Sequence, residues 1–432
     1  MKIAVIGAGI GGMAAAWDLV KAGHEVTIFE SASYVGGLAA GFKEPNWDTS
    51  VERFYHHWFA SDRDMLGLMD ELGFKDKVVF RRPFTVMYHN GKFYPLDSVL
   101  KALTFPGYGG LLGMVRFGLV TVYLRYLAGW KPLEKYTAHE WLSKAYGQNL
   151  YTTMLEPMLQ GKFGPHYKEV TMAWFWARFK TRTTNLGTYQ GGFQAFADQF
   201  ADSLRRKGVR ILLNSAIQEI ESGSQGGMTL HLNDGPQDFD QCLVTTSPGL
   251  LAKLAPRLPP AYLSGLLGLK NMGAVVLVLS LKHKLSEEGY YWYSLPKAAG
   301  YPFLALVEHT NFVPPEQFGG EHIVYIGDYL DLDHEYFKLT QEELLARFLP
   351  HLTKFNPKFQ PDWVNKTWLF RTTYAQPIPL VNHSHNIPEI QTPIPGLFFA
   401  SMSQVYPWDR GTNFAVQIGR KAARLMITAS HL

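Results

Sequence analysis

A glycine-rich turn at the start of the chain constrains the fold more than any other feature. The apolar run Lys2–Ile6 predicts a strand, Gly7-Ala8-Gly9-Ile10-Gly11-Gly12 follows it at once, and the next residues favour a helix. In such a strand–turn–helix unit, Gly7 permits the sharp turn, Gly9 lets the backbone approach a pyrophosphate, and Gly12 lets the helix pack on the strand. We therefore assign Gly7, Gly9, Gly11 and Gly12 to the binding of a dinucleotide.

An acidic residue at a suitable distance supports this assignment. The run His24–Phe29 predicts a second strand, and Glu30 follows it, 23 positions after Gly7. A carboxylate there can bind both hydroxyls of an adenosine ribose and disfavours a 2′-phosphate. Glycine-rich turns also occur for packing reasons, but the preceding strand, the following helix and the acid together favour a dinucleotide site.

A second glycine pair follows the acid. Gly36 and Gly37 can bring another backbone turn against the same pyrophosphate, with exposed N–H groups that bind an anion. The alternative is a plain loop with two flexible residues. The first glycine motif does not separate NAD from FAD.

These features together resemble the FAD-binding flavoprotein superfamily that includes amine oxidases, protoporphyrinogen oxidase, phytoene desaturases and UDP-galactopyranose mutase. Three further segments agree: Tyr189–Glu221, Phe239–Pro248 and Gly396–Met426. In this order, they resemble three elements of the superfamily: a helix followed by a strand, a strand that returns to the nucleotide domain, and a closing strand, loop and helix. The resemblance implies that the backbone of Ile217 meets the adenine.

The resemblance also implies that the closing helix points its N-terminus at the flavin ring. Reduced flavin carries negative charge near N1 and the C2 carbonyl, which free N–H groups and the positive end of a helix dipole stabilise. The residues in that position are Gly411, Thr412, Asn413 and Phe414. The alternative is an ordinary capped C-terminal helix.

Two positions depart from the superfamily pattern. Leu38 stands where many members have an arginine after the glycine pair, and Ser401-Met402 stand where many have Gly-Asp. We expect contacts of Leu38 and Ser401 with the flavin cofactor to come from the backbone. The single cysteine, Cys242, is remote from the C-terminal segment, so the resemblance implies FAD that is bound non-covalently.

The expected fold class is α/β, with a discontinuous Rossmann-like FAD-binding domain and a mixed α+β substrate domain. The substrate domain has strand-like runs at Ala274–Leu281 and His322–Leu330. The expected segments are 1–80, 186–250 and 392–432 for the FAD-binding domain, and 81–185 and 251–391 for the substrate-binding domain.

Two adjacent histidines are candidates for the chemistry. His56 and His57 lie among aromatic residues, and histidine titrates near neutrality, so either ring could exchange a proton beside a flavin. The segment also resembles the histidine-containing segment of UDP-galactopyranose mutase, which makes His57 the catalytic candidate and His56 a substrate contact. The alternative is two packed or surface histidines without a role.

Charged residues near the C-terminus are further candidates. Arg410 can bind an anionic substrate group or a flavin phosphate, and Asp409 can orient it, unless the two form an exposed salt bridge. The resemblance places Arg371 and Tyr374 at the substrate cavity, unless they end a strand among core aromatics. The stretch Met172–Arg182 is expected to be core with a solvated edge.

Composition limits the partners. Lys and Arg total 41, Asp and Glu total 37, and the net charge of +4 is too small to indicate nucleic-acid binding. One cysteine excludes an internal disulfide and a multi-cysteine metal site, and we assign no metal. This cysteine usage, together with the lack of a recognisable signal peptide, predicts a cytoplasmic protein.

The apolar stretch Val99–Trp130 is interrupted by Lys101, Arg116 and Arg125, so it is not a predicted membrane span. We expect it to form core helices of the substrate domain, with peripheral docking to a membrane as the alternative.

The leading hypothesis is an amine oxidase-like FAD oxidoreductase that transfers a hydride from a small organic substrate to flavin. The alternative is a mutase-like enzyme that uses reduced FAD on a nucleotide sugar, in which Arg371 and Arg410 converge on a diphosphate near His57. A third hypothesis, supported by Leu38 and Ser401-Met402, is a non-catalytic flavin-binding module.

Overall fold

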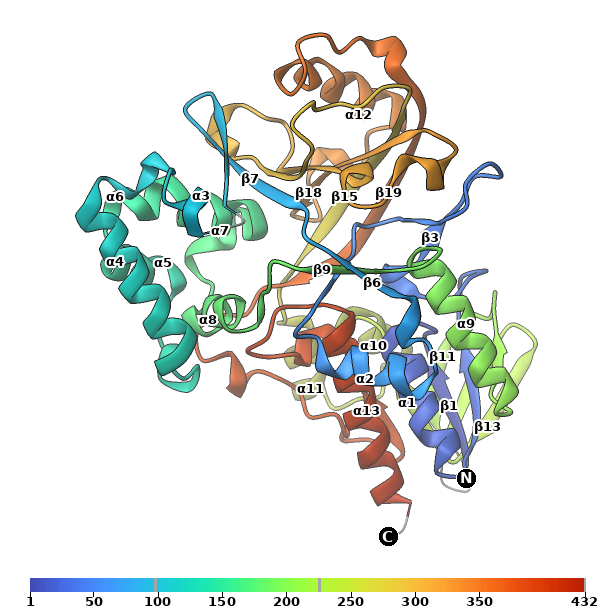
Figure 1. The fold of residues 1–432 in the computed structure, drawn as a ribbon. Coiled ribbons are helices and arrows are strands. Elements are labelled where there is room, and N and C mark those ends of the chain that lie inside the picture. Colours follow the sequence, from blue (N-terminus) through green and yellow to red (C-terminus); the bar gives the residue numbers. More distant parts are fainter. Residues whose placement is uncertain (97–98, 224–226, 431–432) are drawn as a thin grey trace.

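The computed structural model describes residues 1–96, 99–223 and 227–430. Its N-terminal and C-terminal segments lie side by side in the lower part of Figure 1, next to a middle stretch of the chain drawn in green, and the other segments form the upper and left parts. The two termini of the chain therefore belong to the same half of the molecule.

A five-stranded parallel sheet forms the centre of this lower half. The predicted strand Lys2–Ile6 is β1, and β1 lies between β2 and β14. All five strands come from the three segments expected to form the FAD-binding domain. In spatial order they are β10 (Arg210–Leu212), β2 (Glu25–Phe29), β1 (Lys2–Ile6), β14 (Gln241–Val244) and β20 (Leu397–Phe399).

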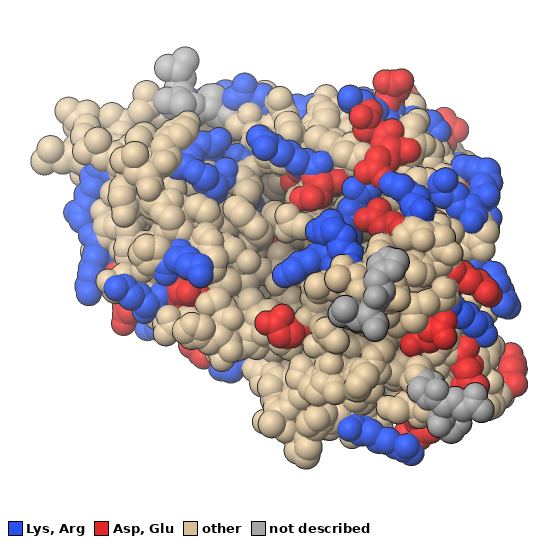
Figure 2. All heavy atoms as spheres, turned by 90° about the horizontal axis from the view of Figure 1, so that it is seen from below, with Lys and Arg blue, Asp and Glu red and all other residues tan. Residues whose placement is uncertain are grey.

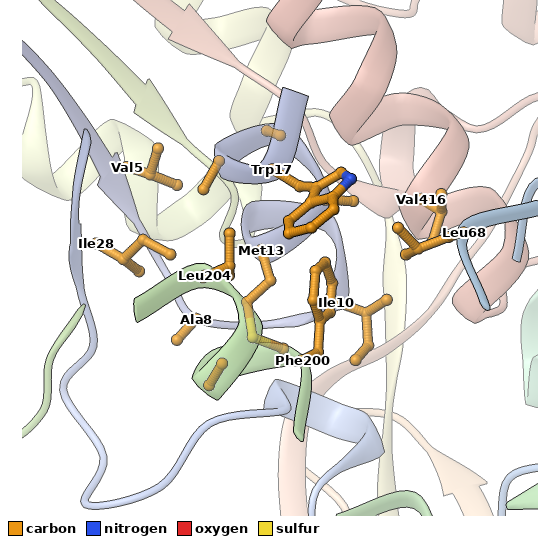
Figure 3. Packing of buried hydrophobic residues seen from close by; sticks show 14 of the residues in the cluster. Val5, Ala8, Ile10, Met13, Trp17, Ile28, Leu68, Phe200, Leu204 and Val416 are labelled. Carbon is orange, nitrogen blue, oxygen red and sulfur yellow. The ribbon is translucent and has the colours of Figure 1, made fainter. Parts of the chain in front are cut away.

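Helices from distant parts of the sequence pack on this sheet. They are α1 (Ile10–Lys21), α2 (Arg63–Glu71), α9 (Gly192–Arg206) and α13 (Thr412–Ala429). Figure 3 shows their buried side chains meeting, among them Met13 of α1, Phe200 of α9 and Val416 of α13. Burial of this apolar surface holds three separate stretches of chain together around the nucleotide turn.

Smaller elements complete this half. Two helices follow β14, and three short antiparallel strands cover one side of the sheet. They are α10 (Pro248–Leu254), α11 (Pro260–Leu267), β11 (Glu219–Ser222), β12 (Met228–Leu232) and β13 (Gly235–Phe239). The strand pair β3 (Gly41–Phe42) and β4 (Val51–Glu52) lies beside α9.

A seven-stranded sheet forms the upper half (Figure 1). Its longest inner strand, β15, spans Asn271–Leu281, and β18 beside it spans His322–Leu330, as the β-branched and aromatic runs predict. In the described residues, neighbouring strands of this sheet pair antiparallel, except for β16 and β7, which pair parallel. This parallel pair joins the two expected substrate segments. In order, the strands are β19 (Val364–Pro377), β15, β18, β17 (Ala305–Glu308), β16 (Tyr290–Ser294), β7 (Phe84–His89) and β8 (Lys92–Pro95). Helix α12 (Gln341–Phe348) packs against β15 and β19.

A group of helices lies beside this sheet, at the left of Figure 1. They are α3 (Val99–Ala102), α4 (Leu111–Val122), α5 (Ala138–Tyr146), α6 (Gln148–Leu150), α7 (Glu156–Phe163) and α8 (Met172–Thr181). None of the twelve residues of α4 is buried, so the expectation that Val99–Trp130 forms core helices is wrong for this helix. Its inner face packs on the other helices, but its outer face has no covering element among the described residues.

The two halves are joined by a small sheet of β5 (Trp58–Phe59), β9 (Leu186–Tyr189) and β6 (Val78–Arg81). Across residues 1–96, 99–223 and 227–430, no helix combines the length and the hydropathy needed to cross a membrane. On the face shown in Figure 2, basic and acidic side chains are interspersed, so this face lacks the continuous basic stripe typical of nucleic-acid-binding proteins.

Candidate flavin and substrate site

The glycine turn between β1 and α1 has the geometry that the motif predicts. Gly7 has a φ of +102°, which L side chains rarely adopt. A Cβ on Gly12 would lie 2.1 Å from the Gly7 carbonyl oxygen, so only glycine lets α1 pack this closely on the strand. The turn therefore holds the start of α1 at the carboxyl end of the parallel sheet.

The second glycine pair lies directly against this turn. Gly9 and Gly36 form an isolated parallel bridge, and the Gly36 N–H donates to the Ala8 carbonyl at 2.9 Å. A Cβ on Gly37 would lie 3.1 Å from the Gly9 Cα. No side chain caps the N-terminus of α1, so its first N–H groups are available to an anion. These residues fit the pyrophosphate of a dinucleotide.

Gly11 has a different role in the structure. A Cβ on Gly11 would lie 3.1 Å from the Ala415 carbonyl oxygen, and a Cβ on Gly419 would lie 2.2 Å from the Gly11 carbonyl oxygen. The two glycines mark the point where α1 and α13 cross. The structure thus places Gly11 at a helix crossing, where it brings the closing helix onto the nucleotide turn.

Glu30 ends β2 beside the glycine turn. Its Oε2 accepts the Ala8 N–H at 2.8 Å, and its Oε1 accepts the Ala32 N–H at 2.9 Å. The carboxylate is thereby fixed next to the start of α1, where a ribose would lie if the pyrophosphate is bound at the helix N-terminus. Ile217 lies in the connection between β10 and β11, on the same half of the molecule.

The N-terminus of α13 faces a cavity. The Thr412 hydroxyl accepts the Trp58 indole N–H at 2.8 Å, and the Asn413 side-chain oxygen accepts the Met65 N–H at 3.0 Å. Both side chains therefore hold neighbouring segments and neither caps the helix. The first backbone N–H groups of α13 stay available, as the predicted contact with a flavin requires.

The cavity has a volume of about 480 Å³ and lies between the two halves of the molecule. Asp409–Phe414 line one part of it, the stretch from Tyr55 to Asp62 lines another, and further lining residues come from β7, α7, α8, β16 and β17. Its apolar wall includes Val86, Met87, Leu96, Met158, Tyr291, Trp292 and Leu304. Such a wall suits the body of an organic substrate.

His56 and His57 both line the cavity. His56 Nδ1 lies 2.5 Å from the Phe54 carbonyl oxygen, and burial lowers the pKa of His56 to about 4. Burial, reinforced by the charge of Arg182, lowers the pKa of His57 to about 3. The expectation that these histidines titrate near neutrality is therefore not met: both rings are half-buried in the cavity wall, and their lowered pKa values favour the neutral form at pH 7.

The Nδ1 atom of His57 is buried and has no hydrogen-bond partner within the described parts of the chain. A buried ring nitrogen without a partner is uncommon in a folded protein. Its position in the cavity wall fits a bound molecule that supplies the missing hydrogen bond.

Asp409 is the centre of a partly buried group of charges. Its Oδ2 accepts from Lys162 Nζ at 2.7 Å and from Arg178 Nη1 at 3.0 Å, and Arg182 Nη2 lies 3.7 Å away. Burial alone would raise the pKa of Asp409, but the surrounding cations lower it well below its usual range. Asp409 is therefore ionised. Burial lowers the pKa of Lys162 well below its usual range, so the excess of positive charge rests on Arg178 and Arg182.

Arg410 is oriented by residues that the sequence did not indicate. Its Nε donates to Gln376 Oε1 at 2.9 Å, and its Nη2 donates to the Tyr329 hydroxyl. From Arg410, Asp409 accepts the backbone N–H and no guanidinium N–H. The expectation that Asp409 orients the guanidinium is therefore wrong. Asp409 and Arg410 both line the cavity and do not form an exposed salt bridge.

Arg371 and Tyr374 lie outside the described lining of the cavity. Arg371 is exposed on the edge strand β19 and donates to the backbone carbonyls of Tyr336 and Leu339. The Tyr374 hydroxyl lies 2.7 Å from Ser403 Oγ. Arg371 and Arg410 thus do not converge near His57, contrary to the expectation for the mutase-like alternative.

The two departures from the superfamily pattern adopt regular local structures. Leu38 lies in a short 3₁₀ turn over Gly37–Ala39. Ser401 begins another such turn, in which its N–H donates to Gln404 and its hydroxyl accepts from Ser403. Neither position is disrupted, so neither indicates a lost site.

Three of the four basic side chains that line the cavity were not predicted from the sequence. Arg178 and Arg182 come from α8 and the residue that follows it, in a stretch expected to be core with a solvated edge, and Lys162 comes from α7. The spacing of four between the two arginines places them on one side of a helix, which was the available signal. No local pattern marks Lys162.

Comparison with known proteins decides the family. Residues 10–427 match the model of the family described as flavin containing amine oxidoreductase. The chain belongs to this family. Flavin containing amine oxidoreductases bind FAD, and the glycine turns and the α13 N-terminus fit this cofactor.

Individual relatives match this chain over a short stretch or at low sequence identity. The zeta-carotene desaturase of Synechocystis sp. is 31% identical over 112 residues, and the match covers 26% of this chain and 22% of that protein. The chain thus matches about a fifth of the length of this relative. The putative flavin-containing monoamine oxidase AofH of Mycobacterium tuberculosis is 25% identical over 284 residues, 61% of each chain.

Solved structures share the fold over the whole chain. A putative protoporphyrinogen oxidase from Exiguobacterium sp. 255-15 has a TM-score of 0.76 at 16% identity, covering 99% of this chain and 98% of that one. Reduced UDP-galactopyranose mutase has a TM-score of 0.76 at 14% identity, covering 99% of this chain and 95% of that one. At these identities the likeness concerns the fold, which is the expected α/β FAD-binding type with a mixed substrate domain.

Proposed function

We propose that this flavin containing amine oxidoreductase oxidises an organic substrate that has an apolar body and an anionic group. The observation that carries the proposal is the composition of the cavity wall. The N-terminus of α13 forms one part, apolar side chains form most of the remainder, and Arg178, Arg182 and Arg410 supply positive charge. Asp409 offsets part of this charge, and the excess favours an anion in the cavity.

Each part of the cavity has a chemical task in this proposal. The glycine turns and the α13 N-terminus would hold FAD, which would supply the two-electron oxidation of a substrate C–H bond. The N–H groups of α13 stabilise negative charge at the ring. The neutral rings of His56 and His57 orient substrate or cofactor by hydrogen bonds, and the arginines bind the anionic group. The apolar wall holds the substrate body.

The cofactor is proposed to be non-covalent. Cys242, the only cysteine of the chain, is fully buried in β14 within the parallel sheet. Its thiol therefore lies inside the core and away from the cavity wall. We expect the purified protein to show the visible absorption of a flavin and to release FAD on denaturation. A colourless protein that takes up no added FAD would support the non-catalytic module instead.

The substrate class is tested by flavin bleaching without oxygen. The probes are matched pairs of organic acids and their amides, added to the oxidised holoenzyme. We expect the acids to bleach the flavin more efficiently than the amides, because only the acids form charge-assisted hydrogen bonds with the arginines. Turnover that appears only after chemical reduction of the flavin, without net oxidation, would instead favour the mutase-like reaction.

One substitution tests which arginine binds the anion. Arg182 is 45% exposed and belongs to the cavity wall, so Arg182→Gln removes a charge without leaving a void in the core. We expect KM for an acid substrate to rise by about ten- to hundredfold and KM for its amide to stay unchanged. Arg371→Gln is the matched control and leaves both values unchanged. If Arg371→Gln raises KM for the acid and Arg182→Gln does not, the substrate binds at β19.

A further inference from the structure

The outer face of α4 and of the π-helical turn that continues it, Tyr123–Leu127, is apolar and exposed. Leu112 is 87% exposed, Leu119 is 67% exposed and Leu127 is 75% exposed. A helix turns by 100° per residue, which places the exposed apolar residues on one continuous side. We call this side the α4 face; its members are Leu111, Leu112, Val115, Leu119, Val122, Tyr123, Tyr126 and Leu127.

The opposite side of the same helix is apolar too. Met114, Phe117 and Val120 pack against the buried core of the helical group, and Leu124 is fully buried in it. A helix on the surface of a globular protein usually places polar residues on its outer side. Since the inner side already anchors α4 to the protein, the α4 face is not needed for folding. In Figure 1, α4 runs along the outer edge of the molecule.

Basic and aromatic residues flank the α4 face along the sequence. Residues 98–133 contain Lys101, Arg116, Arg125 and Lys131 and no Asp or Glu. Glu134, the next acid, is buried. Beyond the end of the π-helical turn, the ammonium groups of Lys131 and Lys135 lie over the rings of Trp130 and Tyr136 at 5.4 and 5.2 Å from the ring centres.

We propose that the α4 face docks on a lipid bilayer that contains anionic lipids. An exposed apolar helix side bordered by basic and aromatic residues inserts into the headgroup boundary, while the basic side chains contact anionic headgroups. A second copy of this chain is a poorer occupant, because it would bring together two segments that each carry Arg116, Arg125 and Lys131 and no acid between residues 98 and 133. The mode is peripheral, since no described helix can cross the bilayer.

Vesicle flotation of the purified holoenzyme tests this proposal. The probes are vesicles of phosphatidylcholine alone and of equimolar phosphatidylcholine and phosphatidylglycerol. We expect the protein to float with the phosphatidylglycerol vesicles, and to bind less at high salt, because salt screens the basic side chains. A wild-type protein that floats with neither kind of vesicle overturns the proposal.

Paired variants separate the α4 face from general surface hydrophobicity. In Leu112→Glu/Leu119→Glu both changes lie on the α4 face, whereas Leu267→Glu/Leu332→Glu changes leucines that are 66% and 50% exposed elsewhere. We expect the first variant to lose binding by about tenfold or more, because two leucines that would insert into the bilayer are replaced by charges that anionic lipids repel, and the second to bind as wild type. Equal binding by both variants overturns the proposal.

The flavin absorption of each variant reports whether the fold is intact. Analytical ultracentrifugation identifies the competing occupant. A wild-type protein that sediments as a dimer, becomes a monomer with Leu112→Glu/Leu119→Glu and does not float would assign the α4 face to a second copy. This test does not depend on the substrate, so it can fail while the proposed oxidation holds.

Discussion

At the scale of single residues, the surroundings of a side chain change its chemistry more than its type does. His57 is the clearest case, because a histidine in water titrates near neutrality and this one does not. Burial removes the solvent that stabilises the imidazolium, and Arg182 adds repulsion. The ring is therefore available as a neutral hydrogen-bonding group, and it does not take up a proton at physiological pH.

His57→Gln tests this role. Glutamine keeps a polar side chain that can donate and accept but cannot titrate. Because the pKa of His57 is about 3, the wild type already holds the ring neutral, and we expect its kcat/KM profile between pH 5 and 8 to show no inflection from this group. The variant lowers kcat/KM by roughly tenfold without changing the shape of the profile. An inflection near pH 6.5 that disappears in the variant would contradict the assignment.

At the scale of elements, most strands and helices of the nucleotide half follow from local sequence. The run Lys2–Ile6 forms β1, and the helix predicted after the glycine turn forms α1. The substrate half was predicted less well, because α4 is apolar on both sides and its exposure depends on what packs beside it. The crossing of α1 with α13 was also missed, since it joins residues about four hundred positions apart.

Gly419→Ala tests the crossing. A Cβ at this position in α13 would lie 2.2 Å from the Gly11 carbonyl oxygen, so the helices must separate. We expect a loss of roughly 2 kcal/mol or more in the free energy of unfolding by urea, together with weaker FAD binding. Gly67→Ala in α2 is the matched control, because its Cβ would meet nothing within 4 Å. That change is expected to stabilise the protein by roughly 0.5 to 1 kcal/mol. Similar effects of both changes would rule out a close crossing.

At the scale of the whole molecule, a buried carboxyl group joins the two halves. Glu52 of β4 accepts the Phe193 N–H of α9 at 3.1 Å and the Tyr325 hydroxyl of β18 at 3.3 Å. Burial outweighs these hydrogen bonds and raises the pKa of Glu52 to about 7. The junction between the nucleotide half and the substrate sheet is therefore most stable when Glu52 is protonated.

The pH dependence of stability tests this junction. Between the unfolded pKa of 4.5 and the folded pKa of about 7, the folded protein keeps a proton that the unfolded chain has lost. The contribution of Glu52 is present below pH 4.5 and is lost as pH rises through 7, by on the order of 3 kcal/mol. Compared with wild type, Glu52→Gln should lose less stability in urea unfolding between about pH 5 and pH 8. If the free energy of unfolding changes with pH by the same amount in both proteins, Glu52 is already ionised in the folded protein.

The sequence by itself determined the nucleotide half, down to the glycines of its turn and the acid after the second strand. These features are local, because a backbone turn, a helix start and a strand are specified by consecutive residues. Only the tertiary structure decided which side chains meet in the cavity. Lys162, Arg178 and Asp409 come from separate elements, and their contacts and pKa values depend on the path of the whole chain. The same holds for the exposed side of α4, since a helix pattern shows that a side is apolar but not whether another element covers it.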